Sequence, residues 1–140
     1  MKALVIWESV TGTTKKAAGL IAGGLRAGGI EASVCPATRV DHGALSAASL
    51  VVVGSWTDGL VFIGQKPGRQ SRLWSLPFMT GKQAFVYCTY AVDAGHAVDK
   101  LAAIVSPSHR NCSRLLTRSF SDRMLFLEGL RNKLEYRKGR

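Results

Sequence analysis

The stretch that decides the fold is "KALVIWESVTGTTKKAAGLIAGGL", residues 2–25. Its opening is mostly apolar and predicts a buried strand. Apolar side chains then recur every four residues from Ala17 to Leu25, which predicts a helix with Thr13 or Thr14 as its N-cap and with its end at the two glycines 28–29. Between the strand and the helix, hydroxyl side chains crowd around a glycine. They are Ser9, Thr11, Thr13 and Thr14, with Gly12 among them.

This crowding of hydroxyl groups is typical of an anion site. A strand that opens onto a helix presents free backbone N–H groups, and the helix dipole adds partial positive charge there. The hydroxyls add further donors, and Gly12 lets a ligand approach the backbone closely. Neither the P-loop pattern nor G-x-G-x-x-G follows the strand. We therefore expect a terminal phosphate held by neutral donors, and the alternative is an ordinary helix cap rich in Ser and Thr.

The rest of the chain alternates strands and helices. Further strands are predicted at 30–35, 50–56, 83–88 and 112–118, and further helices near 43–48, 98–105 and 121–136. Repeated β-α units favour a parallel sheet with helices on both faces. Ligands of such folds bind beyond the carboxyl ends of the strands. The segment 57–73 is interpreted as an irregular binding loop.

Two aromatic side chains follow the strands that lead to this edge. Trp56 stands where the strand 50–56 ends, and Tyr90 lies just after the strand 83–88. Both can stack on a planar ring. Gly59 leaves room for a ring near the backbone, and Thr89 can donate a hydrogen bond to its polar edge. A heterocycle sandwiched between the two loops is expected.

Together these loops resemble the flavodoxin family. "SVTGTT" at 9–14 has the family's T/S-x-T/S-G-x-T phosphate pattern. "GSWTDG" at 54–59 is similar to the loop that places an aromatic on the inner face of the flavin, and "CTYAVDAG" at 88–95 looks like the second flavin loop. "GK" at 81–82, before the fourth strand, is also usual in the family. The resemblance covers residues 1–105.

The resemblance implies an α/β three-layer sandwich, with a five-stranded parallel sheet in the order 2-1-3-4-5, helices on both faces and non-covalently bound FMN. A single domain over 1–140 is expected, in which 106–140 match weakly and 136–140 form a frayed tail. The implied phosphate ligands are Ser9, Thr11, Gly12, Thr13 and Thr14. The implied isoalloxazine contacts are Trp56, Thr57 and Gly59 on one side and Thr89 and Tyr90 on the other. The implied work is electron transfer between a reductase and an acceptor protein.

The charge departs from the family, whose familiar members are acidic. This chain has a formal net charge of +10, and residues 110–140 hold nine Lys or Arg against three acids. An acidic redox partner is therefore expected. Three cations of the segment 57–73, Lys66, Arg69 and Arg72, would stabilise a negatively charged reduced flavin and raise its potential. No nucleic-acid motif is present, so a nucleic-acid partner is not expected.

Composition narrows the remaining classes. A hydrophobic fraction of 46% suits a globular protein, and no run is long enough to span a membrane. The N-terminal apolar run is too short for a secretory signal, so a cytoplasmic location is expected. The cysteines, Cys35, Cys88 and Cys112, are widely spaced and are expected to be reduced thiols rather than metal ligands. No catalytic residue and no metal site is predicted.

Three alternatives to a carrier stay open at this point. One is an FMN-dependent NAD(P)H reductase of quinones or nitro compounds, in which cations of the 57–73 loop meet a pyridine nucleotide. Another is a binding module that keeps the fold and uses its basic surface for an acidic protein or nucleic acid. A third is a phospho-receiver domain with Glu8, Asp58 and Thr89 at its site, but this would lack the second acid of its Mg²⁺ pair and leave the hydroxyls without a role.

Overall fold

The computed structural model describes residues 1–60, 63–77, 79, 81–90, 96–105 and 112–118. Its main sheet contains five parallel strands in the spatial order β2-β1-β3-β5-β6. The strands are β1 (Lys2–Trp7), β2 (Glu31–Pro36), β3 (Leu50–Leu60), β5 (Gln83–Tyr90) and β6 (Cys112–Arg118). Counted without the extra strand β4, this is the predicted order 2-1-3-4-5.

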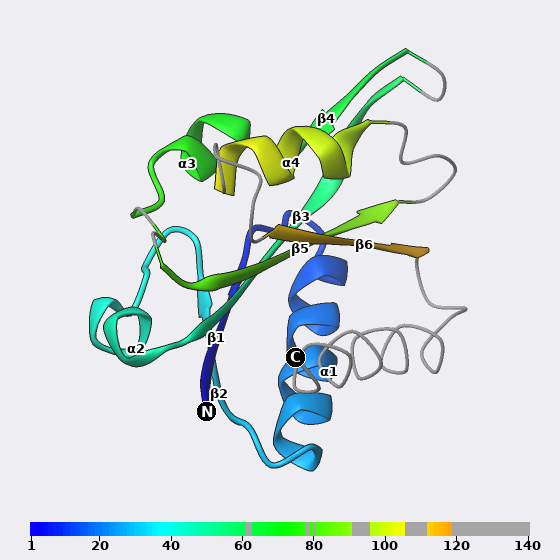
Figure 1. Ribbon diagram of the computed structural model, residues 1–140. Coiled ribbons are helices and arrows are strands. Elements are labelled where there is room, and N and C mark those ends of the chain that lie inside the picture. Colours follow the sequence, from blue (N-terminus) through cyan, green and yellow to red (C-terminus); the bar gives the residue numbers. More distant parts are fainter. Residues whose placement is uncertain (61–62, 78, 80, 91–95, 106–111, 119–140) are drawn as a thin grey trace.

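Helices cover both faces of the sheet, as predicted (Figure 1). They are α1 (Thr13–Ala27), α2 (His42–Ala47), α3 (Gln70–Trp74) and α4 (Ala97–Val105). On one face α1 packs Ile21 and Leu25 against Val5 and Val52. On the other face, α2, α3 and α4 pack against the alternate side chains of the same strands. The result is a three-layer α/β sandwich.

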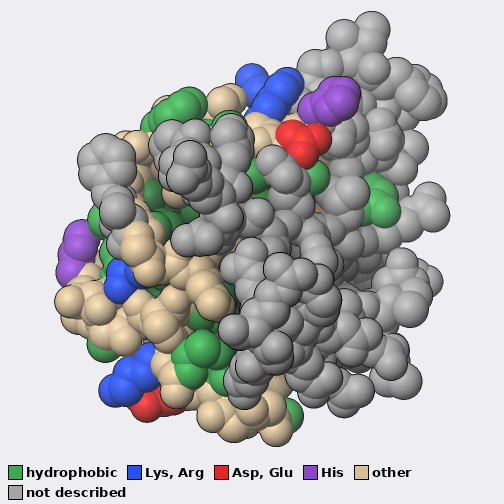
Figure 2. Space-filling view, viewed as in Figure 1, with side chains coloured by type: hydrophobic (Ala, Val, Ile, Leu, Met, Phe, Trp, Pro, Cys, Tyr) green, Lys and Arg blue, Asp and Glu red, His purple; other side chains and the backbone are tan. Residues whose placement is uncertain are grey.

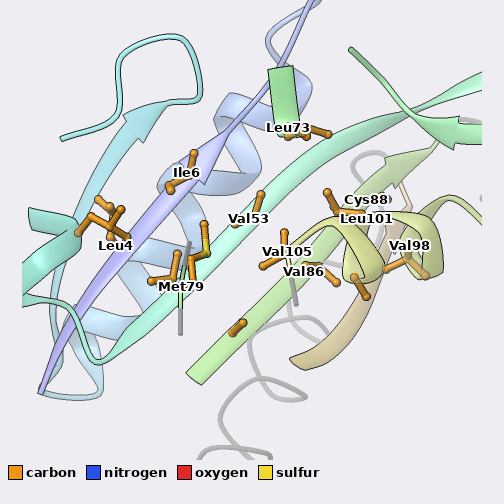
Figure 3. Close-up of a cluster of buried hydrophobic side chains, with 14 of the residues drawn as sticks. Leu4, Ile6, Val53, Leu73, Met79, Val86, Cys88, Val98, Leu101 and Val105 are labelled. Carbon is orange, nitrogen blue, oxygen red and sulfur yellow. The ribbon is translucent and has the colours of Figure 1, made fainter. Parts of the chain in front are cut away.

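The core on the second face is shown in Figure 3. Ile6, Val53 and Val86 of adjacent strands point from the sheet toward Leu73 of α3 and Leu101 of α4, and all five are at most 1% exposed. The central strands are apolar on both sides because both faces are covered. Strand β2, at the edge, is different: Glu31, Ser33 and Val34 are exposed.

One strand was not predicted. β4 (Ile63–Pro67) pairs antiparallel with the distal half of β3, so that Thr57 faces Pro67 and Asp58 faces Lys66. In Figure 1 the two strands form a hairpin that projects from the body of the molecule. A short helix, α3, follows. The interpretation of 57–73 as irregular was therefore wrong, because pairing with β3 satisfies the backbone of a segment whose glycines and proline gave no strand pattern.

The N-cap prediction was also wrong. Neither Thr13 nor Thr14 caps α1; the N-cap is Gly12, in the left-handed conformation at φ 90°. Glycine adopts this conformation without the strain that a Cβ would bring. The predicted stop at 28–29 is confirmed, with Gly28 as the C-cap and Gly29 at φ 77°. The predicted helix 121–136 and the tail 136–140 lie outside the described residues.

Candidate functional site

The turn between β1 and α1 leaves the helix N-terminus without a side-chain cap. Ser9 Oγ accepts a hydrogen bond from the Gly12 N–H at 3.0 Å, which closes the turn, and the Gly12 carbonyl accepts one from the Lys16 N–H at 2.9 Å. Within the described part of the chain, no side-chain hydrogen bond caps the start of α1, and the first turn of the helix carries no acid. Helix N-termini normally satisfy these amides by such caps. The arrangement therefore leaves donors and the positive end of the dipole for an external anion.

The predicted phosphate ligands fall into two groups. Thr11 is exposed, Ser9 and Thr13 are half-buried, and the hydroxyls of Thr11 and Thr13 lie 3.4 Å apart at the mouth of the turn. Thr14 is different because it is only 1% exposed. Its hydroxyl lies 2.9 Å from the hydroxyl of Thr89, which is 5% exposed. Two residues predicted separately, one for the phosphate and one for the ring, are thus hydrogen-bonded to each other.

A buried tyrosine adds a second link between the same elements. Tyr87 Oη donates to the backbone carbonyl of Thr14 at 3.0 Å. Its ring crosses Gly54, its register partner on β3, where a Cβ would lie 1.8 Å from Tyr87 Cζ. Burial raises the pKa of Tyr87 well above its usual range, so the phenol stays a neutral donor.

Trp56 lies beside Thr89 at the carboxyl edge of the sheet, since the two are register partners of β3 and β5. The half-buried indole packs on Gly68: a Cβ there would lie 2.0 Å from Trp56 Cε2. The Gly68 N–H also donates to the Trp56 carbonyl at 2.7 Å, and Ser55 Oγ donates to the Gly68 carbonyl at 3.0 Å. The turn after β4 therefore fixes the indole.

The remaining predicted residues also lie at this edge or on the hairpin. Tyr90 is the half-buried last residue of β5, and successive strand residues point to opposite faces, so Tyr90 and Thr89 leave the strand on opposite sides. Thr57 is half-buried, and its Oγ1 is enclosed without a hydrogen-bond partner in the described part of the chain. Gly59 lies in β3 on the projecting hairpin rather than in a loop.

An ion-pair cluster at the same edge was not predicted. Glu8 is 3% exposed, and its Oε1 lies 3.3 Å from Arg69 Nη1 and 3.5 Å from Arg72 Nη1. Glu8 Oε2 is enclosed without a partner among the described residues. Arg69 is also the sole described non-glycine residue with positive φ, at 48°. The sequence does show an acid directly after a buried strand and two arginines three residues apart. Their spacing along the chain does not predict that these distant segments form ion pairs.

This cluster bears on two expectations. Arg69 and Arg72 were predicted to act as cations near a ring, and in the structure they share one carboxylate, which reduces their combined charge. The phospho-receiver alternative needs Glu8 as a metal ligand, whereas here Glu8 bonds to two arginines. In the described part of the chain, no group of three or more His, Cys, Asp or Glu side chains is placed to hold a metal ion.

We compared the sequence and the structure of this chain with those of known proteins. No protein-family model matches the sequence, and no curated protein matches it. Among solved structures, the two-electron reduced flavodoxin of Megasphaera elsdenii aligns with a TM-score of 0.75 at 12% identity, over 91% of this chain and 94% of that one. This chain has a flavodoxin-like fold. The predicted architecture is therefore confirmed.

Two further flavodoxins support the same conclusion about the flavodoxin-like fold. That of Streptococcus pneumoniae TIGR4 aligns with a TM-score of 0.71 at 22% identity, over 98% of this chain and 99% of that one. One from the domain Archaea aligns with a TM-score of 0.69 at 20% identity, over 93% of each chain. Each alignment extends past the residues 1–105 on which the sequence resemblance rested.

The surface of this chain is basic overall, in keeping with its formal net charge of +10. In Figure 2, Lys and Arg side chains lie in several separate places over the described part of one face. At the carboxyl end of β1, Lys15 Nζ lies 5.6 Å from the centre of the Trp7 ring, while the next residue, Glu8, engages the two arginines. Cations therefore lie near the end of β1 on both faces of the sheet, Lys15 from α1 on one face and the two arginines from α3 on the other. No helix among the described residues is long and apolar enough to cross a membrane.

Proposed function

We propose that the protein binds FMN non-covalently and carries electrons between a reductase and an acceptor protein. The observation that carries the proposal is the N-terminus of α1, which has no side-chain cap, no acid in its first turn and a glycine at its N-cap. These donors fit a terminal phosphate. Ser9 shapes the turn, and Thr11 and Thr13 stand at its mouth.

The rest of the proposed site is built from the carboxyl edge next to this turn. Trp56 and Thr89 are register partners there, and Tyr90 ends β5 beside them. We assign the isoalloxazine to the space between the loops that carry Trp56 and Tyr90, with Thr57 and Gly59 on the side of Trp56. Thr57 Oγ1, enclosed and unpartnered among the described atoms, is a group that a ligand donor or acceptor would satisfy. The bound flavin would supply the redox chemistry, and the protein would tune it by stacking and charge.

The proposed partners follow from the charge. A protein of net charge +10 attracts acidic surfaces, so we infer that the reductase, the acceptor or both present acidic docking faces. The single domain over 1–140 and the cytoplasmic location stay predictions. The rise in the reduction potential of the flavin also stays a prediction. We attribute it to the charge of Lys66 and to the net positive charge that remains when Arg69 and Arg72 share the carboxylate of Glu8.

The first experiment is the visible absorption spectrum of the purified protein, before and after FMN is added and the excess removed by gel filtration. A retained two-banded flavin spectrum is expected. The variant Thr11→Ala/Thr13→Ala should lose it, because both hydroxyls stand at the mouth of the uncapped turn. The matched control is Ser33→Ala/Ser46→Ala, which removes two exposed hydroxyls from β2 and α2 and should retain the flavin.

The outcomes separate the alternatives. A wild-type protein that stays colourless would contradict the proposal and favour the binding module. Turnover of NAD(P)H by the purified holoprotein with a quinone, without an added reductase, would mean that the protein is an enzyme rather than a carrier.

A further inference from the structure

The first turn of α1 is attached to β5 by two hydrogen bonds that meet on one residue. Thr89 bonds to the side chain of Thr14 at 2.9 Å, and Tyr87 donates to the Thr14 carbonyl at 3.0 Å. All three residues are at most 5% exposed. Water competes poorly for hydrogen bonds in such surroundings, so both bonds fix the position of Thr14 strongly. We refer to Tyr87 and Thr89 as the β5 pair.

The geometry points to the β5 pair as positioning residues for phosphate, an inference that rests on the proposed function. Tyr87 and Thr89 hold the N-terminal turn of α1 in place, and either hydroxyl of the Thr14–Thr89 bond can be the donor. In the proposed arrangement Thr89 is the donor and Thr14 Oγ1 accepts. A threonine hydroxyl has one proton and two acceptor lone pairs. When Thr14 accepts from Thr89, its own proton remains available for a phosphate oxygen. Thr89 thus acts through Thr14 instead of touching the flavin ring.

Tyr87 holds the backbone of Thr14 through a bond separate from the hydroxyl bond between Thr14 and Thr89. Tyr87 is a donor whose raised pKa keeps its proton in place, and its ring is seated on Gly54, which has no side chain to displace it. The carbonyl of Thr14 therefore has a fixed partner on β5. The N-terminal turn of α1 is thus held by β5 and has no side-chain cap of its own.

A selective effect on phosphate follows. FMN and riboflavin carry the same ring system and differ by the phosphate. A residue that touches the ring affects the binding of both molecules equally, whereas the β5 pair should affect FMN alone. Thr89→Val removes the hydroxyl and keeps the shape of the side chain, and Thr89→Ser keeps the hydroxyl.

The test is to titrate the full-length apoprotein with FMN and with riboflavin, following the quenching of flavin fluorescence. Thr89→Val is expected to weaken FMN binding about tenfold, an effect of the size that losing one hydrogen bond within the protein can have. Riboflavin binding should change by less than about twofold, and Thr89→Ser should bind FMN as the wild type does. Tyr87→Phe should show the same selective loss.

Contrary outcomes are distinct. An equal loss of both flavins in Thr89→Val would place Thr89 against the ring and overturn the inference, as would unchanged FMN affinity. Should Thr89→Val not fold, Tyr87→Phe decides in the same way.

Inorganic phosphate separates this inference from the proposed function. If the wild type binds neither flavin, the proposed function fails. The β5 pair is then tested by thermal unfolding with phosphate against chloride at equal ionic strength. Stabilisation by phosphate in the wild type that is absent in Tyr87→Phe and Thr89→Val supports the inference, and its absence from the wild type overturns it.

Discussion

Gly54 is the described glycine with the least room for a side chain. A Cβ there would lie 1.8 Å from Tyr87 Cζ and 2.3 Å from its Oη. The Tyr87 ring cannot yield without losing its bond to Thr14. We expect Gly54→Ala to lower the free energy of unfolding by about 3 kcal/mol, as overpacking does in tight cores, measured by urea denaturation.

Two glycines of α1 provide the control for Gly54→Ala. A Cβ on Gly19 or Gly23 meets nothing within 4 Å. Alanine at either position should raise the free energy of unfolding by about 0.5–1 kcal/mol, because it restricts the unfolded chain and favours the helix. A Gly54→Ala variant as stable as these would contradict the close packing with Tyr87.

Gly68 tests the seat of Trp56 by a double-mutant cycle. Gly68→Ala should destabilise the protein, because a Cβ would lie 2.0 Å from the indole. In the background of Trp56→Ala the ring is absent, so the same change should cost less than about 0.5 kcal/mol. Urea denaturation of the four proteins gives the coupling. Additive effects would mean that the backbone of Gly68, and not the indole above it, sets the cost.

Cys88 makes stability depend on pH. Burial raises the pKa of its thiol to about 12 from 9.0. The folded state therefore keeps the proton that the unfolded chain releases above about pH 9, so this contribution to stability is full below pH 9 and is lost as the pH rises toward 12. Between about pH 8 and about pH 10.5, the free energy of unfolding should fall more steeply in the wild type than in Cys88→Ala. Parallel profiles would contradict the raised pKa.

At the scale of elements, α3 is attached to β1 by charge as well as by Leu73. The carboxylate of Glu8 is 3% exposed, whereas Arg69 and Arg72 are 44% and 45% exposed. Removing the acid leaves two arginines that water can solvate, so Glu8→Gln should cost about 1 kcal/mol or less. Removing both cations leaves a buried, unpaired carboxylate, so Arg69→Met/Arg72→Met should cost about 3 kcal/mol or more.

Urea denaturation measures this asymmetry. Lys2→Met is the control, since its pair with Glu31 is exposed at both ends and its loss should change stability by less than about 0.5 kcal/mol. Equal losses in the Glu8 and the double arginine variants would show that the buried carboxylate is not what the arginines stabilise.

Elements differ in how far the sequence could predict them. The strand at 2–7 was predicted from its apolar run, and the end of α1 from the glycines at 28–29. Both predictions depend only on neighbouring residues in the sequence. Strand β4 could not be predicted in this way, because its extended structure depends on pairing with β3. The start of α1 was mispredicted because a threonine is a good cap in isolation, whereas Thr14 is drawn to Thr89, 75 residues away. Tertiary contacts overrode the local preference.

At the scale of the whole molecule, the charge of +10 predicts the sign of a salt effect. Positive surroundings stabilise a negatively charged reduced flavin, and salt screens them. The midpoint potential of bound FMN should therefore fall as salt is raised from about 20 mM to about 500 mM, measured by dye-linked titration. A potential that rises with salt, as acidic surroundings would produce, would contradict the electrostatic role of the cations.

A parallel sheet with helices on both faces was predictable because repeated β-α units leave few topologies. The order of its strands was predicted from the family resemblance. The roles of individual residues within the candidate site were harder to predict. Sequence spacing placed Thr14 and Thr89 in one region but could not show that they bond to each other, nor that Glu8 neutralises part of the charge on Arg69 and Arg72. Such pairings depend on side-chain directions that only the folded sheet defines.

The link between Thr14 and Thr89 also sets an order of events during protein synthesis. The turn at residues 9–14 leaves the ribosome early, yet its partner is 75 positions later in the chain. A nascent polypeptide that stops before β5 contains every residue of the first loop and lacks both residues that hold it. The capacity to retain a phosphate-bearing cofactor should therefore arise late in translation, in one step, when β5 joins β3.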